Sequence, residues 1–85
     1  MEIQVSERFK KSYRKLPKGV KDRAKEKEAI FRTNPFATSL KTHKLSGKEA
    51  GSWAFWVNDS YRIKFIFLPS KEVLFLDIGT HRIYK

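Results

Sequence analysis

Four side chains in this sequence have the chemistry needed to cleave a phosphodiester bond of RNA without a metal. They are the imidazoles of His43 and His81, the guanidinium of Arg62 and the phenol of Tyr84. Attack by a 2′-hydroxyl requires a base, an acid for the leaving 5′-oxygen and a cation beside the phosphorane. Imidazole titrates near neutral pH and can serve as base or acid, and guanidinium binds phosphate oxygens through paired hydrogen bonds. The side chains suit RNA cleavage, provided that the fold brings them together.

Each of these residues also has a purely structural interpretation. A loop histidine in a small protein is more often solvated than catalytic, Arg62 could form an ion pair with Asp59, and Tyr84 could pack on the edge of a sheet. His43 and His81 lie 38 positions apart (81 − 43) with no carboxylate pair nearby. That spacing matches no common set of metal ligands, so we expect no metal and no cofactor.

Length and composition limit the kinds of protein that this chain can be. Its 85 residues carry a net charge of +10, no cysteine and 14% aromatic residues. The lack of cysteine excludes a disulfide scaffold, a zinc knuckle and thiol catalysis, and the aromatic content is too high for a disordered basic tail. No apolar run approaches the roughly 20 residues of a membrane span, and the N-terminus lacks the features of a secretion signal. We expect one domain over residues 1–85, soluble and cytoplasmic, with a strong attraction to polyanions.

The first part of the chain reads as a short strand followed by two helices. Residues 2–5 alternate polar and apolar side chains, and Ser6 is a typical helix N-cap. The helix that it begins has an apolar stripe and ends near Pro17, which also fits the first turn of a second helix. Asn34–Pro35 stops that second helix at about Thr33. We expect the two helices to form an antiparallel hairpin with one apolar side.

The second part of the chain reads as a loop, three strands and a tail. Residues 34–52 have the composition of a loop. Alternation and turn signals predict strands over 53–57, 61–67 and 73–78, and a short tail over 79–85. The order β-α-α-β-β-β predicts an α+β fold, in which an antiparallel sheet has the N-terminal helical hairpin packed on one face.

Charge and aromatic residues separate along the chain. Residues 1–48 hold 14 Lys and Arg against 5 Asp and Glu, whereas residues 49–85 hold 5 against 4 and eight of the twelve aromatic side chains. This distribution predicts a charged helical layer on an aromatic-rich sheet. Trp53 and Trp56 are three apart in one strand, so they must face opposite sides, and at least one belongs to the core.

The face of the sheet away from the helices is expected to hold the chemistry. Arg62 and Lys64 alternate with apolar residues in their strand, so both point away from the helices. A meandering sheet can bring His43 and His81 to one edge with Arg62 between them. This arrangement would place two imidazoles, a guanidinium, Tyr84 and several lysines on one basic surface.

Several segments of the chain resemble the RelE/ParE superfamily of toxins from type II toxin–antitoxin modules. In chain order they are Phe9-Lys10-Lys11 with Leu16-Pro17, then Asn34-Pro35, Leu40 to Gly47, Tyr61-Arg62-Ile63, and Ile78 to His81 with Tyr84. The resemblance implies a RelE-like, microbial-RNase-like fold. Many members of the superfamily are ribosome-dependent endoribonucleases (mRNA interferases) that arrest translation and growth. The ParE branch instead inhibits DNA gyrase and cleaves nothing.

The resemblance also implies roles for individual residues. Arg62 matches the arginine that stabilises the cleaved phosphate, and His81 matches the segment that holds the general acid in the YafQ- and YoeB-like branches. Tyr84 lies where those branches place an aromatic side chain that stacks on a base or assists proton transfer. His43 is similar to a substrate-side histidine of the YafQ-like branch.

The resemblance specifies the general base and the RNA-binding residues less closely. Some branches use a carboxylate as the base, for which Glu49 and Asp59 are both candidates beside His43. Cations of the loop, sheet and tail are expected to bind RNA phosphates: Lys41, Lys44, Lys48, Lys64 and Arg82.

The expected partners are a cognate antitoxin with an acidic segment, the ribosome and mRNA, and no membrane. Two alternatives stay open: a ParE-like inhibitor of gyrase, and a basic nucleic-acid-binding module without catalysis. His81 and Tyr84 distinguish these from the nuclease, because binding alone does not require them.

Overall fold

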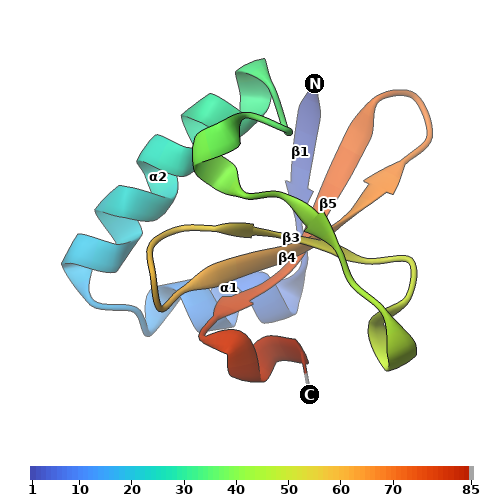
Figure 1. Ribbon diagram of the computed structural model, residues 1–85. Helices are drawn as coiled ribbons and strands as arrows, with labels where there is room; N and C mark the ends of the chain where they lie inside the picture. The colour runs from blue at the N-terminus through green and yellow to red at the C-terminus, as the bar shows by residue number, and fades with distance from the viewer. Residues whose placement is uncertain (85) are drawn as a thin grey trace.

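The computed structural model describes residues 1–84, and Lys85, which belongs to the expected tail, lies outside the described residues. The helices and strands follow the expected order (Figure 1). Their bounds are β1 Glu2–Val5, α1 Glu7–Arg14, α2 Lys18–Thr33, β2 His43–Lys44, β3 Trp53–Trp56, β4 Arg62–Leu68 and β5 Glu72–Gly79. Short 3₁₀ turns are η1 Thr38–Leu40, η2 Gly47–Glu49 and η3 His81–Tyr84. The α+β class is confirmed, and the β-α-α-β-β-β order is found with one additional strand, β2, between α2 and β3.

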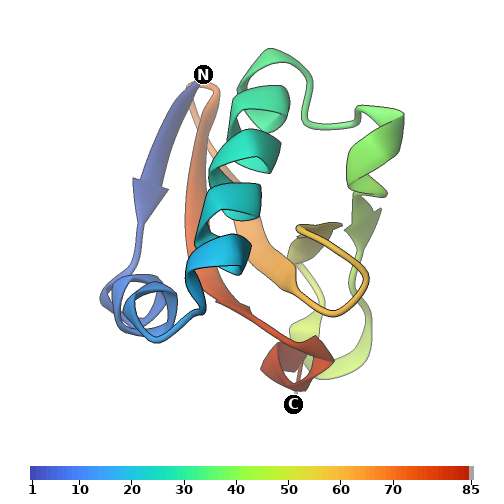
Figure 2. The same cartoon turned by 90° about the vertical axis from the view of Figure 1, so that its left-hand side faces the viewer.

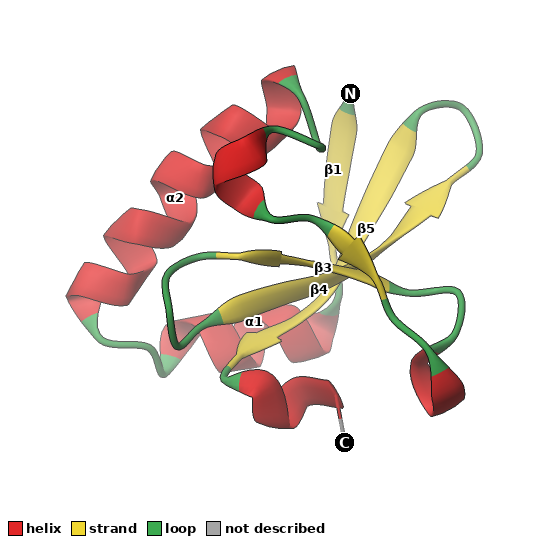
Figure 3. Cartoon of the chain, viewed as in Figure 1, coloured by secondary structure: helices red, strands yellow, loops and turns green. Residues whose placement is uncertain are grey.

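The strands form one five-stranded sheet in the order β1-β5-β4-β3-β2 (Figure 3). Three of the four pairings are antiparallel, but β1 lies parallel to β5. The expectation of a wholly antiparallel sheet was therefore wrong for β1. Since no hairpin joins β1 to β5, the connection between them does not impose an antiparallel direction. The loop expected over residues 34–52 contains the two-residue strand β2, which is too short to show an alternating pattern.

Helix α2 covers one face of the sheet and supplies its central core side chain. Phe31 is fully buried, and its ring centroid lies 4.8 Å from that of Phe55 and 5.0 Å from that of Phe65. Phe75 of β5 lies 5.6 Å from the same ring. These four buried aromatic side chains form the centre of the hydrophobic core, and their burial stabilises the fold.

Helix α1 packs against the edge of β5, beyond the end of β1. The Ser6 hydroxyl accepts a hydrogen bond from the amide of Phe9 and donates to the carbonyl of Leu76, so the N-cap also ties the helix to the sheet. Asp77, only 6% exposed, accepts hydrogen bonds from Ser12 at 2.6 Å and from Arg8 at 3.1 Å. A buried carboxylate thus fixes the position of α1 on the strand.

The two helices do not form the expected antiparallel hairpin. Figure 2 shows α1 end-on while α2 is seen along its length, so the helices cross steeply. Because α1 is tied to β5 through Ser6 and Asp77 while α2 lies over the face, the sheet rather than a helix pair sets the direction of each. Among residues 1–84, no helix is long and apolar enough to cross a membrane.

Candidate active site on the uncovered face of the sheet

The start of β4 presents Arg62 on the face that α2 leaves uncovered. Arg62 precedes the buried Ile63, which faces the helices, and it lies beside Trp56 of β3 and Gly79 of β5 in the sheet register. Alternation along the strand therefore turns Arg62 to the side predicted from the sequence.

The guanidinium of Arg62 is held in one orientation by the turn before it and by a neighbouring ring. Its Nη1 donates to the carbonyls of Asn58 at 2.6 Å and Tyr61 at 3.1 Å. Its central carbon lies 3.8 Å from the centroid of the Trp56 ring. Within residues 1–84, Nε and Nη2 make no hydrogen bond and no carboxylate forms an ion pair with Arg62, so the ion pair with Asp59 is not formed. The remaining donors of a fixed guanidinium are available for a phosphate.

His81 joins Arg62 at one depression of the surface. This open depression, of about 460 Å³, is lined by Asp59, Ser60, Arg62, Thr80, His81 and Arg82. His81 is the first residue of η3 and is exposed, and it follows by two positions the residue that pairs with Arg62 in the sheet. The β4–β5 register thus brings together two groups that are 19 positions apart in sequence (81 − 62).

Tyr84 lies close enough to Arg62 for the charge of the guanidinium to affect the pKa of its phenol. Its hydroxyl is buried and has no hydrogen-bond partner among the residues that the structure describes. Burial raises the pKa of the Tyr84 phenol above its ordinary value of 10.0, and the positive charge of Arg62 offsets part of that rise. The phenol therefore stays protonated at neutral pH, where its hydroxyl can donate one hydrogen bond and can also accept.

The turn η3 reaches this position because β5 ends in a glycine. A Cβ on Gly79 would lie 2.8 Å from the Ile83 side chain, closer than real side chains approach. The Nζ of Lys64 donates to the carbonyl of Ile83 at 3.2 Å and lies 3.3 Å from Glu49. Lys64 and Glu49 are largely buried, 16% and 22% exposed, so both charges are already used to hold η2 and η3 against the sheet.

Of the other sequence-predicted residues, Asp59 and Arg82 line the depression, whereas those in and around β2 lie outside it. His43 in β2 is exposed, pairs with Ala54 in the register, and has its Nδ1 2.9 Å from the carbonyl of Lys41. Lys41 places its ammonium 4.1 Å from the centroid of Trp56, and Lys48 is exposed in η2. Of the three candidates for the base, only Asp59 lines the same depression as Arg62 and His81.

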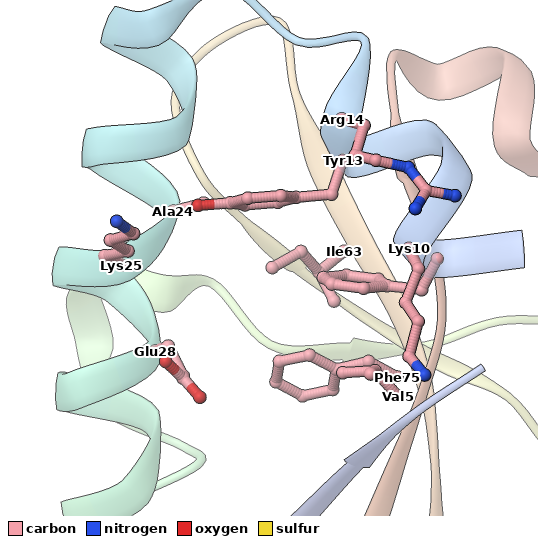
Figure 4. Close-up of a pocket in the computed structure, with 10 residues that line it drawn as sticks. Val5, Lys10, Tyr13, Arg14, Ala24, Lys25, Glu28, Ile63 and Phe75 are labelled. Atoms are coloured by element: carbon pink, nitrogen blue, oxygen red, sulfur yellow. The ribbon is translucent and has the colours of Figure 1, made fainter. Parts of the chain in front are cut away.

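A second hollow lies between the two helices and has a different character. It encloses about 400 Å³ and is lined by Val5, Phe9, Lys10, Tyr13, Arg14, Ala24, Lys25, Glu28, Ile63 and Phe75 (Figure 4). Its floor is apolar, and neither histidine nor Arg62 lines it. The hollow therefore does not carry the chemistry expected for RNA cleavage. Within residues 1–84, no cluster of three or more His, Asp or Glu could hold a metal ion.

Solved structures with this architecture include bacterial toxins. A YoeB/ParE toxin from Agrobacterium tumefaciens superposes with a TM-score of 0.81 at 16% identity, covering 95% of this chain and 99% of that chain. YafQ from E. coli gives 0.79 at 22% identity, covering 98% and 96%, respectively. A structure of an archaeal RelE–RelB complex from Pyrococcus horikoshii gives 0.74 at 19% identity, covering 93% and 92%. No family model matches the sequence, and no curated protein matches it either.

The chain has the fold of the RelE/ParE toxins. The resemblance inferred from short segments of the sequence is thereby confirmed for the fold. Within the RelE/ParE fold, Arg62 and His81 lie on the uncovered face of the sheet, and Tyr84 lies beside Arg62.

Sequence reasoning missed the part that Trp56 plays in this candidate site. Its ring is contacted by both Arg62 and Lys41, at 3.8 and 4.1 Å. The alternation of β3 put either Trp53 or Trp56 on this face, but only the pairing of Trp56 with Arg62 shows which one. The available signal was the position of Trp56 just before the turn that leads to Arg62.

Proposed function

We propose that this chain is the toxin of a type II toxin–antitoxin module and that it cleaves ribosome-bound mRNA without a metal. Its structural likeness to toxins supports the first part, and among these likenesses are a RelE–RelB complex and a DinJ–YafQ toxin–antitoxin complex. The observation that carries the second part is the meeting of Arg62 and His81 at one depression on the uncovered face.

In the proposed reaction the 2′-oxygen of a nucleotide attacks the adjacent phosphorus and the bond from phosphorus to the 5′-oxygen breaks. Arg62 binds the phosphate oxygens and stabilises the negative charge of the phosphorane. His81 gives a proton to the leaving 5′-oxygen, and the products are a 2′,3′-cyclic phosphate and a 5′-hydroxyl. Tyr84 is assigned no step in this reaction, because its hydroxyl is buried and it does not line the depression.

The base that accepts the 2′-hydroxyl proton is proposed to be Asp59. Glu49 is largely buried against the ammonium of Lys64, which occupies both of its carboxylate oxygens. His43 lies on β2, outside the depression. Asp59 lines the depression and forms no ion pair within residues 1–84, so its carboxylate is free to accept a proton.

Electrostatic attraction would hold the RNA on this surface. Arg82 lines the depression, while Lys41, Lys44 and Lys48 are exposed around β2. Lys64 contributes less, because Glu49 already neutralises it. Binding should weaken steeply as salt rises, since each phosphate contact releases counterions. The same cations suit an antitoxin with an acidic segment, and the cytoplasm is where ribosomes and mRNA meet.

The test is inducible expression of the wild type and of His81→Ala, followed by mapping of transcript ends. We expect discrete in-frame cuts with the wild type, loss of these cuts with His81→Ala, and no cuts in extracts without ribosomes. Intact transcripts with broken DNA would instead identify a gyrase inhibitor. Intact transcripts with intact DNA would indicate a nucleic-acid-binding protein that has no catalytic activity.

A further inference from the structure

Three aromatic side chains form an exposed cluster on the helix side of the sheet, away from the candidate active site. This aromatic surface consists of Phe36, Trp53 and Phe67. The ring centroids lie 5.6 Å apart for Phe36 and Trp53, 6.0 Å for Phe36 and Phe67, and 5.4 Å for Trp53 and Phe67. Phe36 follows the C-terminal end of α2, so the surface lies where that helix no longer covers the sheet.

The aromatic surface is open to solvent although it continues the core. Phe36 is 55% exposed and Phe67 is 40% exposed, whereas Phe65, 5.2 Å from Phe67, is fully buried. The two exposed rings lie nearly parallel, with 27° between their planes, and Trp53 stands edge-on to both. Contiguous exposed apolar groups of this kind mark a place where something binds.

The charges around the aromatic surface favour an anionic occupant. The Lys44 ammonium lies 5.8 Å from the centroid of the Trp53 ring. Lys44 pairs with Trp53 in the sheet register and forms no ion pair within residues 1–84, and the whole chain carries a net charge of +10. Flat rings beside an unpaired cation match the flat bases and charged phosphates of a single strand of nucleic acid.

We propose that the aromatic surface binds unpaired bases of single-stranded RNA, with Lys44 on the adjoining phosphate. This deepens the proposed function, because it gives the same RNA a second point of contact. Trp53 and Trp56 lie three residues apart on opposite faces of β3, roughly 10 Å along the strand. A strand of RNA that crosses the edge of the sheet at β2 would thus run from the aromatic surface to the candidate active site.

Binding can be measured apart from cleavage with a short 2′-O-methyl oligonucleotide, in which the attacking hydroxyl is blocked. The full chain is titrated with this RNA at fixed salt, comparing wild type, Phe36→Ala, Phe36→Leu and Phe36→Trp. Stacking on one ring is worth roughly a five-fold change in affinity or more. We expect Ala and Leu to weaken binding by at least that factor and Trp to preserve or tighten it.

Matched controls separate stacking from charge and from general apolarity. Ile30→Ala removes an apolar side chain of similar exposure, 37%, from α2 and should leave the affinity unchanged. Lys44→Gln should lower the slope of log affinity against log salt by about one. Thermal unfolding of each variant checks the fold, and the pair Phe67→Ala and Phe67→Leu repeats the test on a second ring.

Two outcomes would overturn the proposal. Equal affinity of wild type, Phe36→Ala and Phe67→Ala would mean that RNA is held by charge alone. Weaker binding for Ala but full binding for Leu would point to an apolar docking surface for a protein partner. Failure of the proposed function gives a different result: cleavage on the ribosome would be absent while the oligonucleotide still bound the aromatic surface.

Discussion

The two tryptophans of β3 show how one short strand supports two different surfaces. Trp53 lies on the helix side, where its neighbours are Phe36 and Phe67 and a single lysine approaches its ring. Trp56 lies on the uncovered side, where Arg62 and Lys41 both contact its ring. The same residue type thus belongs to an aromatic cluster on one face and orients cations on the other.

The difference shows that the partners of a tryptophan, rather than the tryptophan itself, decide what it does. An indole face attracts any cation placed over it, and it packs equally well against another ring. On the uncovered face, the pairing with Arg62 converts this attraction into a fixed direction for a guanidinium. Four predictions test whether only the Trp56 side carries the chemistry.

The largest effect is expected at His81, the proposed proton donor on the Trp56 side. His81→Gln keeps a hydrogen-bond donor but cannot transfer a proton, so the cleavage rate should fall by about 10²–10⁴. Single-turnover cleavage of mRNA on purified ribosomes measures this. His43→Gln is the matched control, since His43 lies outside the depression, and it should cleave nearly as well as wild type. An equal loss of cleavage rate in both variants would indicate that His43 acts as the base.

A slightly smaller loss is expected at Arg62. Arg62→Ala removes the cation beside the phosphorane and should lower the rate by about 10²–10³. The hydrogen bonds to the carbonyls of Asn58 and Tyr61 are lost with it, which costs about 1–3 kcal/mol of stability. Circular dichroism should still show the folded protein, and Arg62→Lys should recover part of the rate. An unfolded Arg62→Ala variant would instead make Arg62 a structural residue.

A moderate loss of cleavage rate is expected when the Trp56 ring is removed, and no loss is expected when Phe replaces Trp53. Trp56→Leu removes the ring that holds Arg62 and should lower the cleavage rate by about two- to thirty-fold, whereas Trp56→Phe keeps most of it. Trp53→Phe retains an aromatic ring on the other face and should cleave like wild type. An unchanged cleavage rate in Trp56→Leu would show that this ring is not needed to orient Arg62.

The smallest effect is expected at Tyr84. Because burial raises its pKa, the folded protein holds the phenol proton more tightly than the unfolded chain does. Stability from this source is complete below the unfolded pKa of about 10 and is lost as the pH rises through the folded pKa. Tyr84→Phe should remove this alkaline loss, as urea unfolding at neutral and alkaline pH would show. Near neutral pH the change should not destabilise, because the hydroxyl has no partner within residues 1–84.

Local patterns were enough to predict most of the elements. The Ser6 cap, the stop at Asn34–Pro35 and the alternation around Arg62 each depend on neighbours in sequence, and the structure has α1, α2 and β4 where those patterns lie. The two-residue strand β2 could not be predicted in this way, since only its pairing with β3 defines it. Asp77 was missed as well, because its partners Arg8 and Ser12 lie at the other end of the chain.

The sequence by itself determined which side chains are available and which face of a strand each one takes. Arg62 opposite Ile63, and Trp53 opposite Trp56, follow from the two-residue period of a strand whatever the rest of the fold does. The partners of those side chains were decided only by the tertiary structure. The β4–β5 register puts His81 at the depression with Arg62, and the packing of η2 and η3 on the sheet pairs Lys64 with Glu49 and with the carbonyl of Ile83. Such pairings join residues 15 to 19 positions apart through the sheet register and the packing of turns, which no local periodicity encodes.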